Sequence, residues 1–244
     1  VPAAGGRGGD HFLKGKKDFR TMQSREALIP YFFSSAHPFA RALVAACRYP
    51  WELVPRLSEV FATESLAELP LKRIAYNIWV EDGGEVEDGA SIEGRIVVGR
   101  GSIVRRHAVV RGDVVLGRGC LLGHFTEVKN ALLYDGVQLP HLSYVGDSVL
   151  GTGAHLGAGA KISNFRSLPG EIRLDFSDGR LALPGEKFGA VLGDGVEVGC
   201  NAVLYPGSIL GPRCVVYPLT GFRGTAEAGT IVKGAGNEQR VPRR

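Results

Sequence analysis

The sequence predicts a mainly β fold, a parallel β-helix built from hexapeptide repeats. Nine aliphatic residues recur at every sixth position from Val80 to Val128 without interruption, and most of them are followed four positions later by a small or modest side chain. The same spacing returns between Leu192 and Val216. A period of six fits neither an α-helix nor a half-buried strand, but it fits a triangular coil in which each hexad forms one short face. The aliphatic side chains would fill the interior, and the 35 glycines suit many tight turns.

Composition and charge limit the classes of function. The net charge is +4, but residues 1–21 and 221–244 each carry +3, so the rest of the chain carries −2. A nucleic-acid-binding protein would carry its positive charge on the folded surface, so we expect no nucleic-acid partner. No apolar run approaches the ~20 residues that span a bilayer, and the chain does not open on an apolar leader core. We expect a cytoplasmic protein without a membrane partner.

The cysteines indicate neither a zinc site nor a redox site. The four residues form no CxxC pair, so we expect reduced thiols at Cys47, Cys120, Cys200 and Cys214. Cys120 and Cys214 fall on the small, inward position of the repeat, where a buried thiol packs as a small apolar group.

Four segments are expected along the chain. Residues 1–23 are Gly-rich and basic, and we interpret them as a disordered or processed leader segment. Residues 24–76 show helical periodicity, with Ser35 as a candidate N-cap and an apolar face in Trp51–Val60. We expect this α-helical cap to cover the first coil, because an open β-helix end presents unpaired strand edges. The two remaining segments are the β-helix itself, 77–235, and a solvated basic tail, 236–244.

The ladder of aliphatic residues is irregular in two places. Its register slips by one residue after Val128 and again after Val145, and the repeat then breaks over about residues 165–190. Within the break, the segment EIRLDFSDGRLALPG alternates around Asp178-Gly179, a pair that favours a hairpin turn. We therefore expect an outward loop with a hairpin here. Arms of this kind commonly reach over an active site or a neighbouring subunit.

Two histidines occupy equivalent positions of neighbouring coils. His124 and His141 each lie two residues after an inward aliphatic residue, so they should stack about 5 Å apart. Glu127 lies on the same coils, and a histidine beside a carboxylate is the arrangement of a general base. Lys129 with Arg111 would suit a phosphate or another anion. The alternative interpretation of each residue taken alone is that it is an ordinary surface residue, because the outer faces of a solenoid are polar.

The order of these residues strongly resembles one family. The chain reads GHFTEVKNA, then PHLSYVGD, HLGAGAKISNF and EKFGAVLGDGVEVG. Over about residues 95–215 this is similar to the C-terminal, left-handed β-helix acetyltransferase domain of bifunctional N-acetylglucosamine-1-phosphate uridyltransferase/glucosamine-1-phosphate acetyltransferase. The resemblance implies a homotrimeric N-acetyltransferase of nucleotide-sugar biosynthesis, which acts on an amino-sugar phosphate with acetyl-CoA as donor and needs no metal for the transfer. The uridyltransferase domain has no counterpart in this sequence, so the resemblance implies only the second activity.

The resemblance also implies a role for each matching residue. His141 takes the place of the catalytic base that deprotonates the attacking amine, and Glu127 takes the place of the carboxylate near it. The positions that match sugar-phosphate contacts are Arg111, Lys129, Tyr144, His155 and Lys187. The positions that match the acetyl-CoA side are Ala158, Asn164, Phe165 and Cys200.

The sequence departs from this family's pattern at several of those positions. His155 stands where the family has a sugar-contacting asparagine, Phe165 where it has a tyrosine, and Cys200 where it has a serine. The insertion between Ser167 and Glu186 is also longer than in the family. These departures concern recognition of the sugar more than of the phosphate, so another amino sugar or another acyl group remains open.

Two alternatives of other classes follow from the same residues. A catalytically silent solenoid that binds a sugar phosphate or a nucleotide sugar would explain the substitutions at His155 and Phe165. A γ-carbonic-anhydrase-like metalloprotein is the second, because HAVVRGDVVLG resembles that family's strand motif. Leu133 stands where its first histidine ligand would follow, and no two histidines are five residues apart. A stacked His124–His141 pair would then need a further ligand for zinc.

Overall fold

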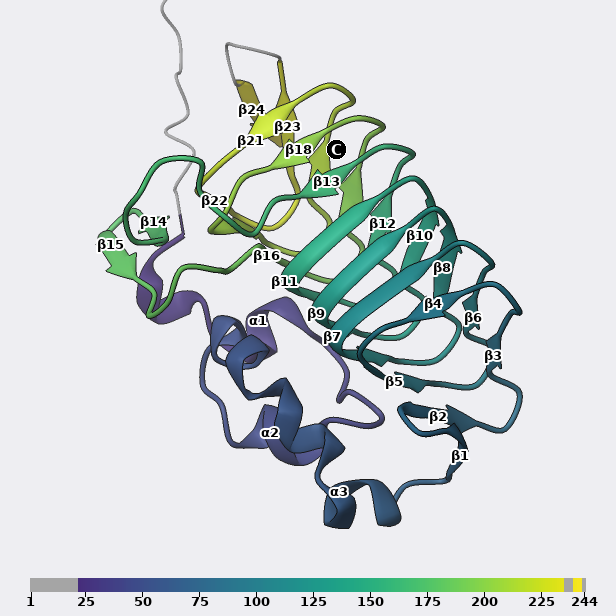
Figure 1. Ribbon diagram of the computed structural model, residues 1–244. Helices are drawn as coiled ribbons and strands as arrows, with labels where there is room; N and C mark the ends of the chain where they lie inside the picture. The colour runs from purple at the N-terminus through teal and green to yellow at the C-terminus, as the bar shows by residue number, and fades with distance from the viewer. Residues whose placement is uncertain (1–21, 235–238, 243–244) are drawn as a thin grey trace, which may run out of the picture.

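The strands wind into a parallel β-helix with three faces, which confirms the predicted fold. The structure is a computed structural model that describes residues 22–234 and 239–242 (Figure 1). Face 1 is made by the strands β2 (Ile78–Glu81), β5 (Arg95–Val98), β16 (Ala190–Leu192), β19 (Ser208–Leu210) and β22 (Thr225–Ala226). Three long strands supply both face 3 and the middle of face 1, and they are β7 (Val109–Leu116), β9 (Glu127–Leu133) and β11 (Tyr144–Leu150).

Faces 2 and 3 complete each coil. Face 2 runs through β3 (Glu85–Val86), β6 (Ile103–Val104), β8 (Leu121–His124), β10 (Gln138–His141), β12 (His155–Leu156), β17 (Glu197–Val198), β20 (Val215–Val216) and β23 (Thr230–Lys233). The remaining strands of face 3 are β4 (Ser91–Ile92), β13 (Lys161–Ile162), β18 (Val203–Leu204) and β21 (Gly221–Phe222).

The aliphatic ladder fills the interior in register. On face 2, for example, Val104 pairs with Leu122, which pairs with Leu139 on the next coil. These side chains are fully buried, and they belong to one apolar cluster that extends from Val80 to Val232. Because side chains alternate across a strand, the residues that flank each ladder position face outward. The period of six therefore determines which residues line each face.

The two register slips occur at the corner between face 3 and face 1. Val110 pairs with Val128 eighteen residues later, whereas Val128 pairs with Val145 only seventeen residues later. The coil is shortened where β9 and β11 run through the corner, with Asn130 and Asp147 in the left-handed conformation at φ 45° and 46°. Asn and Asp tolerate this conformation better than other residues with a side chain. We call this corner, with Gly112 on the preceding coil, the asparagine corner.

The N-terminal segment does not sit where the sequence suggested. Its described residues form short helices, half of them 3-10 helices and half α-helices: η1 (Ser24–Glu26), α1 (Ile29–Phe32), α2 (Arg41–Ala45), η2 (Pro50–Glu52), η3 (Val54–Phe61) and α3 (Thr63–Ala67). They pack along the side of face 1 instead of covering the first coil (Figure 1). The reason is that the outward residues of face 1 are apolar and form one buried cluster with the helices: Val97, Val115, Leu132, Val149, Val191 and Ile209.

Other details of this segment also differ from expectation. The strand β1 (Leu71–Ala75), inside the expected helical cap, pairs antiparallel with β2 and covers the edge of the first coil. Ser35 caps no helix; its hydroxyl lies 3.2 Å from that of Thr152. The neighbouring Ser34 instead gives both its N–H and its hydroxyl to Asp194, each at 2.7 Å. Both serines therefore make polar contacts with the solenoid, and neither acts as the expected helix N-cap.

His37 fixes the N-terminal segment to the solenoid. Its buried ring has Nε2 2.9 Å from the carbonyl oxygen of Leu133, and its Nδ1 accepts the N–H of Phe39 at 3.2 Å. These partners select the neutral tautomer with the proton on Nε2. Tyr134, also fully buried, stacks on Phe33 at 4.4 Å between ring centroids and meets His37 edge-on at 5.0 Å.

The insertion forms the predicted hairpin. Strands β14 (Arg173–Phe176) and β15 (Gly179–Ala182) pair antiparallel around Ser177 and Asp178, one residue earlier than the expected turn. The hairpin folds against the N-terminal segment of its own chain, where Asp178 accepts the N–H and hydroxyl of Ser24 at 2.9 and 2.8 Å. Its apolar side chains join the same buried cluster as the helices.

The chain termini bear on two further expectations. Residues 239–242 form β24 (Gln239–Pro242), which pairs antiparallel with β23, so this part of the expected basic tail belongs to the sheet. A last coil with an unpaired edge would invite pairing with another chain, and β24 covers it. The proposed leader over 1–23 lies almost wholly outside the described residues. Within the described part of the chain, no helix combines the length and the apolar character needed to cross a bilayer.

Replacing Leu132 by alanine should weaken the contact between the N-terminal segment and face 1. Leu132 is fully buried in that interface, so Leu132→Ala should lower the free energy of unfolding by about 2–5 kcal/mol. Urea denaturation measures this, with Leu168→Ala as control. Leu168 is 73% exposed, so its loss should change stability by less than ~0.5 kcal/mol. Equal effects of the two variants would contradict the described interface.

The stability of the protein should fall on mild acidification because of His37. Burial lowers the pKa of His37 from 6.5 to about 4. Between these values the unfolded chain binds a proton that the folded one excludes, so stability is full above pH 6.5 and decreases down to about pH 4. The loss attributable to His37 is about 3 kcal/mol. Unfolding curves of wild type and His37→Gln across this range check it, since the variant should lack this part of the decrease.

Candidate functional site

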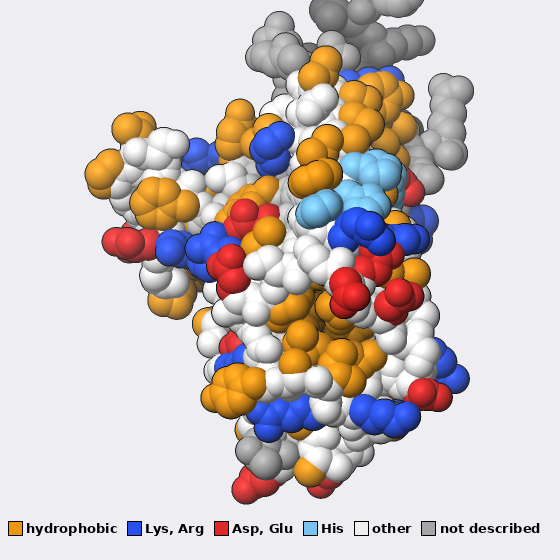
Figure 2. Space-filling view, turned by 45° about the vertical axis from the view of Figure 1, so that its right-hand side comes forward, with side chains coloured by type: hydrophobic (Ala, Val, Ile, Leu, Met, Phe, Trp, Pro, Cys, Tyr) orange, Lys and Arg blue, Asp and Glu red, His pale blue; other side chains and the backbone are white. Residues whose placement is uncertain are grey.

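Two histidines stand on neighbouring coils at the corner between face 2 and face 3. His141 pairs with His124 in the register of β10 and β8, which confirms the predicted stacking. His124 has Nδ1 3.0 Å from the carbonyl oxygen of Arg106, whereas His141 is exposed. On the coil before, His107 stacks on Phe125 with 5.1 Å between ring centroids. Figure 2 shows histidines gathered on one face of the molecule beside basic and acidic side chains. We call this corner the histidine corner.

Face 3 carries a pair of cations at its other end, beside the asparagine corner. Arg111 and Lys129 occupy the same outward position on adjacent coils. Arg111 donates from Nη1 to Oε1 of Glu127 at 2.7 Å and lies 3.9 Å from Glu93. Glu127 is thereby engaged by Arg111, and no hydrogen bond joins it to His141. The expected histidine–carboxylate pair is therefore not formed between these two residues.

A buried network connects face 3 to the asparagine corner. Asp147, with only 7% of its side chain exposed, accepts the amide of Asn130 at 2.9 Å and the amide of Asn164, and it lies 3.8 Å from Nζ of Lys129. The hydroxyl of Tyr144 donates to Oδ1 of Asn164 at 3.2 Å. Burial raises the pKa of Tyr144, and the charges of Glu127 and Asp147 raise it further. The phenol therefore stays protonated and able to donate.

Two members of this network escaped the sequence analysis. Asn130 and Asp147 lie one residue past Lys129 and Gly146, at the corner where each coil loses a residue. The signal for them was the register slip, together with a residue type that accepts the left-handed conformation. Their effect is to hold Lys129 and Asn164 in fixed positions, because a buried carboxylate requires partners for its oxygens.

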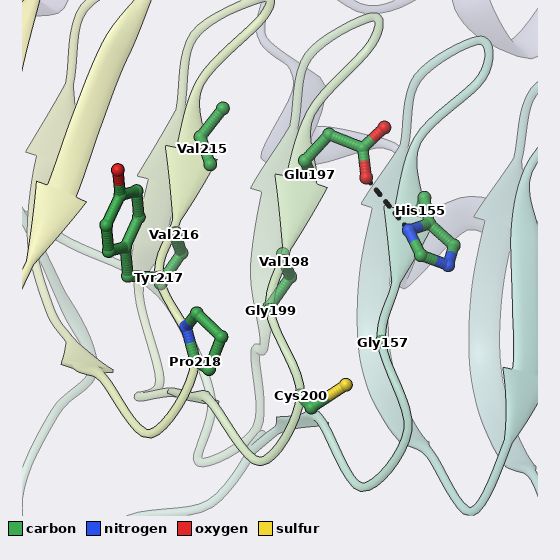
Figure 3. Close-up of a pocket in the computed structure, with 10 residues that line it drawn as sticks. All are labelled: His155, Gly157, Glu197, Val198, Gly199, Cys200, Val215, Val216, Tyr217 and Pro218. Carbon is green, nitrogen blue, oxygen red and sulfur yellow. Dashed lines mark hydrogen bonds and ion pairs between the residues drawn. The ribbon is translucent and has the colours of Figure 1, made fainter.

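His155 and Cys200 belong to a separate groove on face 2. This groove, of about 320 Å³, is lined from three adjacent coils and includes Glu197, Tyr217 and Pro218 (Figure 3). Nδ1 of His155 lies 2.8 Å from Oε2 of Glu197, across the coil boundary that the insertion creates. This is a histidine–carboxylate pair, which sequence reasoning missed because Glu197 lies 42 residues away. Cys200 is exposed, as a free thiol.

The other expected site residues lie at the edges of face 3. Ala158 is near the histidine corner, where its carbonyl accepts the N–H of Asn201 at 3.0 Å. Phe165 and Lys187 form an isolated antiparallel bridge at the base of the insertion. The structure thus places five of the sequence-derived residues on or beside face 3 in two groups. Arg111 and Glu127 form an ion pair, and Lys129, Tyr144 and Asn164 belong to the network around Asp147. His141 lies at the histidine corner, and His155 and Cys200 line the groove on face 2. The others, Ala158, Phe165 and Lys187, lie at the edges of face 3.

Comparison with known proteins assigns the chain to a family. The model described as the GMPPB C-terminal domain matches residues 92–218, just over half of the chain. The chain belongs to this family. The matched stretch contains the histidine corner, the asparagine corner and the groove on face 2.

Curated relatives of the chain confirm the resemblance derived from its motifs. The bifunctional sugar-1-phosphate nucleotidylyltransferase/acetyltransferase of Sulfurisphaera tokodaii is 33% identical over 174 residues, 61% of this chain and 43% of the relative. The bifunctional protein GlmU of Methanococcus vannielii is 35% identical over 101 residues, 39% of this chain and 24% of the relative. The chain therefore spans less than half the length of these relatives.

Solved structures match the chain at low identity and with low TM-scores. The acetyltransferase domain of PglB from Neisseria gonorrhoeae, in complex with acetyl coenzyme A, is 16% identical with a TM-score of 0.37, over 77% of this chain and 66% of that one. AntD, an N-acyltransferase from Bacillus cereus in complex with dTDP and Coenzyme A, is 17% identical with a TM-score of 0.35, over 75% and 90%.

Replacing Asp147 by asparagine should destabilise the corner that supports this site. An amide at this position would direct one N–H₂ group at the amide donors of Asn130 or Asn164, so at least one buried donor loses its acceptor. We expect the free energy of unfolding to fall by about 1–3 kcal/mol. Denaturant titration measures this, with Asp82→Asn as control because the side chain of Asp82 is 95% exposed. A change in Asp147→Asn no larger than in the control would show that the network contributes no stability.

Proposed function

We propose that this protein transfers an acetyl group from acetyl-CoA to the amino group of a sugar phosphate, with glucosamine-1-phosphate or a close analogue as acceptor. The observation that carries the proposal is that face 3, which carries the cation pair Arg111–Lys129, begins at the corner where the imidazole of His141 is exposed. An anion site beside a general base is what an amino-sugar phosphate requires. The names of the curated relatives, which combine sugar-1-phosphate nucleotidylyltransferase with acetyltransferase, support it.

The phosphate would bind to Arg111 and Lys129. A guanidinium offers five N–H donors, so Arg111 can bind Glu127 and still donate to a phosphate oxygen. Lys129 has 18% of its side chain exposed, and its salt bridge to Asp147 at 3.8 Å leaves ammonium protons for a ligand. The hydroxyl of Tyr144 gives its single proton to Oδ1 of Asn164, so on the same face it offers its oxygen as an acceptor for a sugar hydroxyl. Together these groups would fix the sugar with its amine toward the histidine corner.

His141 would then act as the general base. Its imidazole takes a proton from the amine as nitrogen attacks the thioester carbonyl carbon, and the C–S bond breaks to release coenzyme A, whose thiolate is reprotonated. Holding both substrates on one rigid corner supplies much of the rate enhancement. Ala158, Asn164, Phe165 and Cys200 remain the proposed contacts of acetyl-CoA, and His155 and Lys187 remain proposed contacts of the acceptor. A homotrimer in the cytoplasm is proposed with them.

A catalytically silent binding module is the second candidate. The specific observation in its favour is that Glu127 pairs with Arg111, which leaves His141 without the carboxylate that would orient its ring. Such a module would bind a sugar phosphate or a nucleotide sugar on face 3. The γ-carbonic-anhydrase alternative has no comparable observation, because within residues 22–234 and 239–242 no three His, Cys, Asp or Glu side chains gather as metal ligands.

Release of free thiol from acetyl-CoA in the presence of glucosamine-1-phosphate tests the proposal. His141→Ala should lower kcat at least about a hundredfold, the usual scale for a general base. Lys129→Ala should mainly raise KM for the sugar phosphate, because its contact is with the phosphate. Arg100→Gln, a surface change on an early coil, serves as control and should leave both constants unchanged. Saturable binding of the sugar phosphate without any turnover would favour the silent module instead.

A further inference from the structure

The row of outward residues that begins with Arg111 and Lys129 continues along face 3. Ser163, Tyr205 and Arg223 each directly follow a paired ladder residue of β13, β18 and β21, so they occupy the same row on later coils. With coils ~4.8 Å apart, Tyr205 lies about 14 Å from Lys129 along this row. One face therefore connects the cation pair to the base of the insertion.

A cavity of about 460 Å³ lies where this row meets the start of the insertion. Its lining includes three arginines and three large apolar side chains: Arg166, Arg173, Arg223, Phe165, Leu168 and Tyr205. The apolar three are all exposed, at 53% for Phe165, 73% for Leu168 and 46% for Tyr205. Water-exposed aromatic rings grouped in a concave site indicate a place where a ligand is bound rather than ordinary surface.

The arginines give this cavity an excess of positive charge. Arg173 lies 3.4 Å from Glu171, and Arg166 donates to the backbone carbonyl of the same residue. Arg223 is 3.9 Å from Asp175, whose close partner at 2.8 Å is Arg180. Among the described residues, three arginines and no Asp or Glu line the cavity itself. The side chains of Arg173 and Arg223 are about half exposed, which leaves them accessible to an anion in the cavity.

The aromatic side chains are positioned as flat surfaces. The ring of Tyr205 lies across the next coil above Gly221, where an added Cβ would come within 2.9 Å of the tyrosine hydroxyl. Any side chain at Gly221 would lift the ring from the face. Phe165 also lines the cavity, and its backbone is bridged to Lys187 at the base of the insertion. A planar heterocycle could stack on either ring.

We propose that this cavity binds a nucleoside phosphate. The base stacks on Tyr205 or Phe165, an interaction that every base can make through its π-face. The phosphates are bound by Arg173 and Arg223, since guanidinium matches phosphate geometry with paired N–H donors. The inference rests on the cavity and its charge and does not require the acyl transfer proposed above. Two sources share this chemistry, the phosphoadenosine part of coenzyme A and the nucleotide of a nucleotide-linked sugar.

Isothermal titration calorimetry on the full chain tests this site without any turnover. UDP, GDP, ADP and adenosine 3′,5′-bisphosphate serve as probes, with adenosine and inorganic pyrophosphate as the separated halves. At least one nucleotide should bind at micromolar to submillimolar concentration, and each half should bind at least about tenfold more weakly. Arg173→Gln combined with Arg223→Gln, and separately Phe165→Ala combined with Tyr205→Ala, should each weaken that binding about tenfold or more. Arg100→Gln and Tyr76→Ala are the matched controls and should bind as wild type does.

The outcomes separate the two sources and can overturn the proposal. Preference for adenosine 3′,5′-bisphosphate supports the site with coenzyme A as its source, and preference for UDP or GDP supports it with a nucleotide sugar as its source. No saturable binding of any nucleotide at millimolar concentration overturns the proposal, and so does binding that the cavity variants leave unchanged. A change of oligomeric state in the variants with unaltered nucleotide binding would assign the cavity to contact between copies instead, which also overturns it.

Discussion

The coils of this protein stack only when each of them places its aliphatic side chains in the interior at the same register as its neighbours. A slip of one residue in a strand would turn every inward side chain outward, so the chain tolerates a change of length only at a corner. Eighteen-residue coils become seventeen-residue coils at the asparagine corner, and the ladder on all three faces remains aligned. Because the register is fixed, the outward residues of successive coils form straight rows, and the candidate site is made of such rows.

The shortened corner links stability to the site. Left-handed backbone at Asn130 and Asp147 brings polar side chains to the point where face 3 ends, and Asp147 is buried there. A buried carboxylate is costly unless its oxygens are satisfied, and here two amides and Lys129 satisfy them. The same contacts fix the amide that receives the hydroxyl of Tyr144. The missing residue in the repeat thus creates the corner whose buried side chains hold the polar cluster on face 3 in place.

The sequence allowed the interior and the rows to be predicted, but not the pairing of charges between rows. The stacking of His141 on His124 follows from counting residues, since equal offsets from the ladder give equal heights. Counting does not determine whether the side chain of Glu127 turns toward His141 or toward Arg111, because that depends on its rotamer and on the nearby charges. In the structure Glu127 accepts a hydrogen bond from the guanidinium of Arg111 at 2.7 Å. His155 and Glu197 could not be paired from sequence because the insertion separates their coils by 42 residues. Only the observed register identifies them as neighbours.

The position of the N-terminal segment has a similar explanation, and it bears on the cavity. Each of Val97, Val115, Leu132 and Val149 directly precedes a ladder residue, so face 1 presents apolar side chains to the outside as well as the inside. Such a face has to be covered, which draws the helices to the side of the solenoid and leaves β1 and β24 to cover the ends. The hairpin of the insertion packs on those helices, so its strands do not cover face 3. Only the start of the insertion lies beside face 3. Lengthening a loop costs little free energy, so an insertion anchored in this way can form a wall of a cavity beside face 3 without disturbing the coils that position His141 and Lys129.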